Sequence, residues 1–220
     1  MDGLININGN SVQSLEVIFL LSLLTLLPSL IVMMTSFTRY IITLSFLRNA
    51  IGTQQTPPNM VLIGIALFLT LFTMRPVIDE IKTQAYTPYT HEEITQAEFL
   101  DRAQVPLKEF MLRQTEASSL ELYCDLANLE IPADQDEAVS LPLQVVVPSF
   151  MTSELKTAFQ IGFYLYIPFL LIDIVVSSTL MSMGMIMLPP SMISTPFKLL
   201  LFITLNGWEL LFSTLVQGFR

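Results

Sequence analysis

The sequence has few of the residues on which most catalytic and metal sites depend. Its 220 residues include a single cysteine, Cys124, and a single histidine, His91. One cysteine excludes an internal disulfide framework and Cys-rich metal or cluster sites, and one histidine excludes metal sites built from several histidines. The eight glycines form no Walker or Rossmann pattern, and the sequence carries no zinc signature or triad motif. We therefore expect no enzyme, no cofactor and no bound metal.

Charge is also scarce, and it is unevenly distributed. Only 13% of the residues are charged and 52% are hydrophobic, whereas a soluble domain carries about 25% charged residues. The formal net charge of −9 opposes binding to nucleic acid through a basic patch. The whole excess lies in residues 75–157, which hold six basic and fifteen acidic side chains. An acidic middle between two hydrophobic ends indicates a membrane protein.

Four apolar runs are candidates for membrane-type helices. The first, residues 15–34, is near the ~20 residues that a membrane helix needs. Residues 1–14 hold no basic residue, and no small-residue cleavage site is evident. The run is therefore interpreted as retained, or as the mature end of a chain whose signal is absent. The second, residues 60–74, stops at Arg75-Pro76 and is short for a crossing, so burial against other protein is the alternative. The third and fourth, residues 161–188 and 197–216, flank a proline pair and predict a C-terminal helical hairpin.

The composition divides the chain into three parts. Residues 1–81 form an N-terminal hydrophobic helical region, residues 82–147 an acidic polar helical segment, and residues 148–220 a C-terminal hydrophobic helical hairpin with a Met-rich turn. We predict helices in the acidic part, with a loop over residues 129–147.

Three local patterns predict helix starts in the acidic part. Thr90–Glu93 and Thr95–Glu98 each fit a capping box, in which two side chains satisfy free backbone N–H groups. Pro106 can open a helix, and residues 118–128 predict a further one.

Basic residues in short connections predict which ends face the cytoplasm. The connection between the first two runs carries Arg39 and Arg48 without an acid, and the connection between the last two leads into Lys198. Both connections are therefore expected to be cytoplasmic. The acidic middle and both termini would then lie on the outer side.

Asp173 lies in the middle of the third apolar run. A carboxylate in hydrocarbon is costly and usually faces a cavity or a partner. Two interpretations follow: a structural ion pair with Lys198, and an ion or proton site. If the helix continues to Pro189, Asp173 lies about 24 Å and Lys198 about 12 Å from the turn. The pair is then expected between staggered neighbouring copies, not within one straight hairpin.

A methionine-rich stretch directly precedes the proline turn. Met181, Met183, Met185 and Met187 alternate with other residues there. Methionine is unbranched and adaptable, so it seals irregular contacts without fixing one geometry. Two interpretations stay open. One is a flexible apolar turn that packs or anchors. The other is a deformable ring, formed by several copies around an axis, that seals around variable cargo.

Several strings in the sequence together resemble one protein family. They are Met34–Arg39, Leu47–Ala50, Phe110–Thr115, Val147–Gly162, Pro196–Leu201 and Gly207–Trp208. On these strings, and over nearly its whole length, the chain is similar to the FliP family of flagellar export proteins. The SctR proteins of type III injectisomes are related to that family.

The resemblance implies a fold, a function and partners. Proteins of the family form the core of an export gate, in which several copies wind into a closed helical ring with FliQ-type and FliR-type subunits. Unfolded export substrates pass through the centre. For this chain the resemblance implies an all-α fold of membrane-type hairpins with a polar helical middle segment, in the bacterial inner membrane at the flagellar basal body. The implied partners are further copies of itself, those subunits, FlhA-type and FlhB-type proteins, and membrane lipid, without nucleic acid.

The family's methionine-rich loop, a proposed gasket, falls by position on Met181, Met183, Met185 and Met187. Ile186 departs from a run that is often continuous methionine. The strings look more flagellar than injectisome-like. The alternatives are an injectisome gate subunit and a proton-coupled transporter subunit that uses Asp173, although a transporter is expected to show further intramembrane polar sites and internal pseudo-symmetry.

Overall fold

The computed structural model describes residues 4–7, 10–13, 18, 21–22, 25, 29, 32–53, 55–185 and 187–219, and this part of the chain is almost entirely helical. An antiparallel pair, β1 (Leu4–Ile7) and β2 (Asn10–Gln13), supplies its only strands. The helices are α2 (Phe37–Ile51), α3 (Asn59–Ile81), η1 (Lys82–Tyr86), α4 (Thr87–Thr90), α5 (Gln96–Gln114), α6 (Ala117–Ala127), α7 (Gln135–Val139), α8 (Leu143–Ser182), α9 (Pro190–Thr204) and α10 (Gly207–Gln217). The predicted all-α class is confirmed. Most of the first apolar run lies outside the described residues, so the structure does not bear on whether it is a signal peptide. Ile186 also lies outside them.

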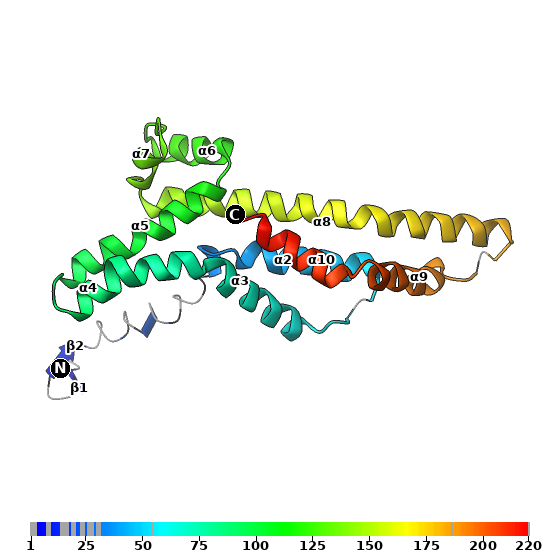
Figure 1. Ribbon diagram of the computed structural model, residues 1–220, viewed down its shortest axis with the longest axis horizontal. Helices are drawn as coiled ribbons and strands as arrows, with labels where there is room; N and C mark the ends of the chain where they lie inside the picture. Colours follow the sequence, from blue (N-terminus) through cyan, green and yellow to red (C-terminus); the bar gives the residue numbers. More distant parts are fainter. Residues whose placement is uncertain are drawn as a thin grey trace.

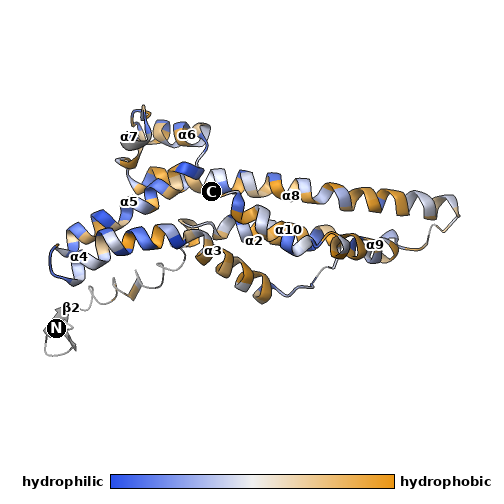
Figure 2. Cartoon of the chain, viewed as in Figure 1, coloured by the Kyte–Doolittle hydropathy of each residue, from blue (hydrophilic) through white to orange (hydrophobic). Residues whose placement is uncertain are grey.

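The helices are arranged along the 40-residue α8, which at 1.5 Å per residue is about 60 Å long. In Figure 1, α2, α9 and α10 accompany one part of α8, while α3 with α4, and α5 returning beside them, extend in the other direction. Figure 2 shows hydrophilic residues gathered on α4 and α5, and hydrophobic residues on α9, on the first half of α3 and on the far half of α8. The molecule therefore has an apolar end and a polar end.

The second apolar run is part of a longer helix than its sequence predicts. α3 passes through Pro76 and continues by way of η1 and α4 to Thr90, a run of 32 residues. The predicted stop at Arg75-Pro76 is wrong because proline removes only one helical hydrogen bond, and the neighbouring Met74 and Val77 are held in a buried cluster. The helices Asn59–Thr90 and Leu143–Ser182 are long and apolar enough to cross a membrane, and α9 with α10, bent by 63°, would make a third such span.

The predicted helix starts in the acidic part have mixed outcomes. The capping box at Thr95 is confirmed, since the Thr95 N–H donates to Glu98 Oε2 at 2.8 Å and the Glu98 N–H donates to Thr95 Oγ1 at 3.4 Å. The box at Thr90 is wrong, because Thr90 ends α4. Pro106 lies inside α5 instead of opening a helix, since the capping box at Thr95 starts this helix ten residues earlier, at Gln96.

The helix predicted over residues 118–128 is confirmed as α6, which ends at Asn128 in the left-handed conformation. The loop predicted over residues 129–147 is wrong in part, because α7 forms within it and α8 already begins at Leu143. The C-terminal hairpin is confirmed as α8 and α9. The fourth apolar run is broken between α9 and α10 by Asn206, whose φ is 49°.

Two buried clusters hold the helices together. The first joins α2, α3, α8, α9 and α10 around Tyr40, Leu44 and Phe169. The second joins the end of α3 to α5, α6, α7 and the start of α8 around Met111 and Phe150. The boundaries predicted at residues 81/82 and 147/148 fall inside continuous helical runs, so the three-part division remains a prediction about composition.

Lys108 connects α5 to α7 at the edge of the second cluster. Its Nζ donates to the Val139 carbonyl at 3.0 Å. Burial lowers the pKa of the Lys108 ammonium, because the charged form loses solvation. One of the six basic residues of the stretch 75–157 is thus used inside the fold.

Gly162 allows α8 to approach α2 closely. A Cβ at this position would lie 2.5 Å from Cγ and 3.0 Å from Cβ of Phe46. Phe46 also meets Phe159 edge to face, with ring centroids 5.1 Å apart. The glycine is required here by space, not by its backbone conformation.

Gly162→Ala is expected to lower the free energy of unfolding by about 1–3 kcal/mol, the usual cost of overpacking. The matched control is Gly64→Ala in α3, where a new Cβ meets nothing within 4 Å and a better helix propensity adds up to about 1 kcal/mol. Denaturant unfolding of the detergent-solubilised chain, followed by circular dichroism, measures both. Equal effects of the two substitutions would contradict the close approach.

Candidate functional site

The methionine-rich stretch lies at the tip of the α8–α9 hairpin, at one extreme of the molecule (Figure 1). α8 is closed by Gly184, whose φ is 76°. The Gly184 N–H donates to the Met181 carbonyl and the Met185 N–H to the Leu180 carbonyl, both at 3.0 Å. These two bonds form a Schellman motif, which ends a helix at a residue in the left-handed conformation. Glycine at this position therefore turns the chain where the methionines lie.

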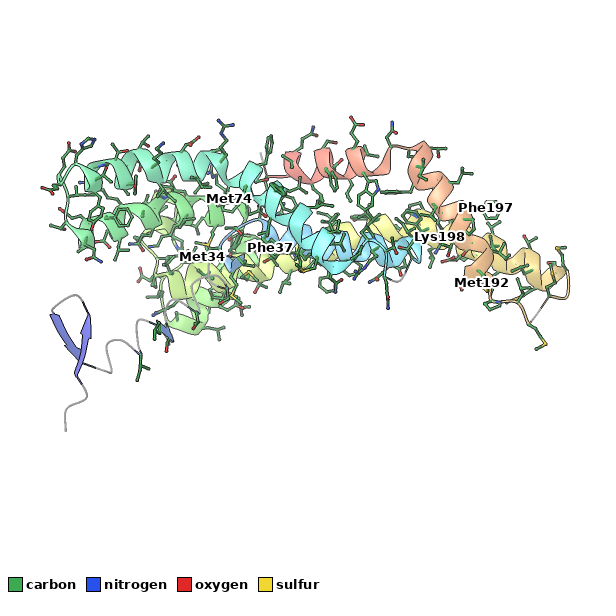
Figure 3. All side chains as sticks on the ribbon, turned by 90° about the horizontal axis from the view of Figure 1, so that it is seen from below. Met34, Phe37, Met74, Met192, Phe197 and Lys198 are labelled. Carbon is green, nitrogen blue, oxygen red and sulfur yellow. The ribbon has the colours of Figure 1, made fainter. Side chains whose placement is uncertain are left out.

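The four predicted gasket residues all present their side chains to the outside. Met181, Met183 and Met187 are 67%, 65% and 98% exposed, and Met185 is 38% exposed. On the other side of the turn, Met192 adds a further exposed methionine in α9 (Figure 3). The hairpin tip is therefore an apolar surface that the chain itself leaves uncovered.

Asp173 and Lys198 form an ion pair within one chain. Lys198 Nζ lies 2.6 Å from Asp173 Oδ2 and also donates to the Ala50 carbonyl at 3.1 Å. Lys198 is buried, whereas the Asp173 side chain is 38% exposed. The pair thus joins α8 to α9 and anchors both to the end of α2.

The expectation that this pair forms only between neighbouring copies is wrong. That expectation assumed a helix that continues to Pro189, but α8 ends at Ser182 and residues 183–189 lie outside both helices. Asp173 is nine residues before the end of α8 and Lys198 is eight residues after the start of α9, which places them about 14 Å and about 12 Å from the two helix ends. They are therefore level.

Sequence reasoning missed a second, more deeply buried ion pair. Arg39 in α2 donates through Nε to Glu154 Oε2 in α8 at 2.8 Å, and its Nη2 pairs with Glu154 Oε1. Arg39 also donates to Gln114 Oε1 at 3.2 Å and to the Gly218 carbonyl at 3.3 Å. Its guanidinium lies 3.8 Å above the ring centroid of Phe219, a cation–π distance.

One signal in the sequence could have indicated this pair. Glu154 follows small and polar residues on one face of a long apolar helix, with Ser153 and Ala158 buried beside it. Since acids are almost never fully buried unless they are paired, such a position demands a partner. The sequence does not say that the partner is Arg39, which lies 115 residues earlier.

The pairing of Arg39 changes the basis of the predicted topology. Arg39 is not in a connection but inside α2, with its charge satisfied by Glu154. Arg48 also lies in α2, where it donates to Asn59 Oδ1 at 2.5 Å and to the Pro57 carbonyl at 3.3 Å. The cytoplasmic placement of this connection and the outer placement of the acidic middle therefore remain predictions.

The remaining candidates have structural surroundings. Cys124 is buried in the second cluster, and His91 is exposed in the turn after α4. Among the residues described by the structure, no three His, Cys, Asp or Glu side chains gather where they could hold a metal ion.

Glu154→Gln is expected to lower the free energy of unfolding by about 3–5 kcal/mol, because it leaves the Arg39 charge buried without its counterion. Glu116→Gln is the matched control. It removes the same charge from a pair with Lys156 that is partly exposed, and such pairs contribute at most about 1 kcal/mol. Denaturant unfolding in detergent compares them, and a Glu154 effect no larger than the control would refute the buried pair.

A double-mutant cycle tests the Asp173–Lys198 pair inside the single chain. Asp173→Asn and Lys198→Met should each destabilise the detergent-solubilised monomer, and the coupling energy should be about 1 kcal/mol, since one partner is partly exposed. The exchange Asp173→Lys with Lys198→Asp restores the ion pair and should recover part of the lost stability. Recovery should be incomplete, because the contact to the Ala50 carbonyl is not restored. Zero coupling in the monomer would show that the pair does not form within one chain.

The chain has extensive similarity to known proteins. A sequence model of the FliP family matches residues 20–215. The chain is 51% identical over 213 residues to the flagellar biosynthetic protein FliP of Aquifex aeolicus (strain VF5), which covers 96% of this chain and 88% of the relative. It is 53% identical over 207 residues to that of Pectobacterium carotovorum subsp. carotovorum, covering 94% and 79%, and 47% identical over 210 residues to that of Bacillus subtilis (strain 168), covering 96% and 94%. The predicted resemblance is confirmed, and the chain belongs to the FliP family.

Proposed function

We propose that the chain is a core subunit of the flagellar type III protein export gate and forms part of the closed channel through which unfolded flagellar proteins leave the cell. Its relatives carry the name flagellar biosynthetic protein, which supports a flagellar role over an injectisome one. The helices that are long and apolar enough to cross a membrane support a membrane location, the bacterial inner membrane at the basal body. The subunit is structural and performs no enzymatic reaction.

The observation that carries this proposal is the exposed methionine tip. Met181, Met183, Met185 and Met187 project from a turn that the Schellman motif fixes at the end of α8. When several copies surround an axis with their tips turned inward, these side chains meet as a ring. Methionine side chains adopt many conformations at little cost. Such a ring can therefore seal the channel when it is empty and open when a substrate chain passes.

The exposed apolar surface of α8 supports assembly with other subunits. Phe163, Leu171 and Ile174 are each more than half exposed along this helix. Only 11% of its most apolar 18-residue stretch is buried. A surface of this kind needs a cover of protein or lipid. Further copies of the chain, FliQ-type and FliR-type subunits and lipid would supply it, with FlhA-type and FlhB-type proteins and the unfolded substrates as the other partners.

In this arrangement the Asp173–Lys198 pair fixes the spacing of the two helices that carry the gate. The hydrophilic helices α4 and α5 (Figure 2) form the acidic middle segment, which we assign to the periplasmic side. The polar and the apolar ends of the molecule would then correspond to regions outside and within the assembled channel.

A proton-coupled transporter subunit that uses Asp173 is the second candidate function. Its support is weaker, because Lys198 Nζ already donates to Asp173 Oδ2 at 2.6 Å. A proton site needs a carboxylate that can exchange its proton with a pathway, whereas this carboxylate is in direct contact with the Lys198 ammonium.

Native mass spectrometry of the detergent-extracted particle, expressed with its FliQ-type and FliR-type neighbours, tests the gate. A particle with several copies of this chain and both neighbours is expected. A bare monomer or dimer that retains no neighbour would remove the ring and favour the transporter.

Replacement of the four tip methionines by serine is expected to raise the leak of ions through the assembled gate, because serine is too small and too polar to seal the constriction. Met60→Ser is the matched control, since Met60 is 79% exposed at the start of α3, far from the tip in sequence. Ion leak in cells or reconstituted vesicles measures the effect. An unchanged leak would count against the gasket, while intact assembly by mass spectrometry would show that the variant folds.

A further inference from the structure

A cavity of about 480 Å³ lies between α3, α5 and the C-terminal end of α10. Phe72, Pro76, Phe110, Val216 and Phe219 supply most of its apolar wall. A second hollow of about 340 Å³ between α3 and α10 shares Phe72 and Val216 with it. The two adjoin along α3 and form one groove, which we call the α3–α10 groove.

Two polar side chains at one end of this groove, Arg113 and Gln114, can donate hydrogen bonds to a ligand. Arg113 lines it and is exposed, and it has no hydrogen-bond or salt-bridge partner among the described residues. Gln114 also lines it, and its Oε1 already accepts from Arg39 at 3.2 Å, which leaves the amide N–H groups to donate. Among the described residues, no acidic side chain lines either hollow, although the chain has a net charge of −9.

The two ends of the groove differ in chemistry. Leu69, Phe72 and Phe212 line the end toward the apolar half of the molecule. Arg113 and Gln114, in the last turn of α5, line the other end, and Figure 2 shows hydrophilic residues along α5. The change of polarity along α3 occurs at Arg75-Pro76, beside the groove. A ligand that fits has an anionic head at the polar end and an apolar tail toward the other.

We propose that the α3–α10 groove binds one anionic phospholipid. The lipid phosphate accepts hydrogen bonds from the Arg113 guanidinium and the Gln114 amide, and an acyl chain lies along α3 against Phe72 and Val216. The guanidinium fork matches phosphate geometry and remains charged at any physiological pH. Charge complementarity favours an occupant with an anionic head over an uncharged apolar segment, which would leave the Arg113 guanidinium without an acceptor.

The proposed lipid is bound specifically and differs from the bulk lipid of the surrounding bilayer. α3 has exposed apolar side chains such as Phe68 and Phe72, and at the groove this surface reaches the cationic side chain of Arg113. Binding is therefore expected to depend on the headgroup charge: phosphatidylglycerol should bind, and phosphatidylcholine, whose ammonium offsets the phosphate, should bind more weakly.

Native mass spectrometry of the detergent-solubilised full chain, titrated with phosphatidylglycerol, tests the site. Arg113→Gln should weaken the first lipid adduct about tenfold or more, the usual effect of losing a charge-assisted hydrogen bond. Arg102→Gln is the matched control, because Arg102 is exposed on the same helix, about 16 Å away along its axis, and does not line the groove. Equal binding by both variants would overturn the proposal.

A second variant separates the lipid from a free anion. Ser213→Phe fills the apolar end of the groove and removes only a hydrogen bond to the Leu210 carbonyl of its own helix. It should weaken phosphatidylglycerol binding about tenfold but leave any binding of inorganic phosphate unchanged. Arg113-dependent binding of inorganic phosphate without lipid binding would overturn the lipid assignment.

Photo-crosslinking tests the occupant in the assembled particle. A photoreactive amino acid at position 72 should label lipid when the chain is purified with its FliQ-type and FliR-type neighbours. Labelling of a protein chain instead would show that a subunit covers the groove, and would overturn the proposal without affecting the gate itself.

Discussion

The buried ion pair between Arg39 and Glu154 connects parts of the chain that are far apart in sequence. Through one guanidinium, α2 is bonded to α8, to Gln114 at the end of α5 and to the carbonyl of Gly218 near the C-terminus. A charge in this position is tolerated because each of the three guanidinium nitrogens donates to an acceptor. Both hydrophobic clusters meet here, since Phe219 stacks on the guanidinium and packs against each of them. The position of α8, and so of the hairpin tip, depends on this contact.

The hairpin combines a fixed stem with an adaptable tip. Asp173 and Lys198 join the two helices at the same height, and Lys198 is held in turn by the carbonyl of Ala50. Beyond this pair, α8 ends at Ser182, Gly184 turns the chain, and the methionines face outward. A stem that is bonded to α2 sets where the tip lies, while the methionine side chains remain free to change shape. This division suits a seal that must both hold its place and deform.

The chain by itself leaves a large apolar surface uncovered. Along α8 and α9, many large hydrophobic side chains are exposed, and the α3–α10 groove ends at an arginine without a partner. Both features fit a subunit of the membrane assembly that the family relationship supports, in which protein and lipid divide the remaining surface between them. The proposed lipid site rests on charge, because Arg113 at the end of this groove offers a guanidinium beside an apolar wall.

The sequence by itself determined the helical class, the membrane character, the C-terminal hairpin and the family, because apolar periodicity, composition and long strings of residues are local properties. The capping box at Thr95 was predictable for the same reason. The sequence could not determine that α3 continues through Pro76, since the packing of Met74 and Val77 outweighs the helical hydrogen bond that the proline removes. Nor could it pair Arg39 with Glu154 across 115 residues, or bring Asp173 level with Lys198. Those contacts depend on where each helix ends and what it packs against, which only the tertiary structure decided.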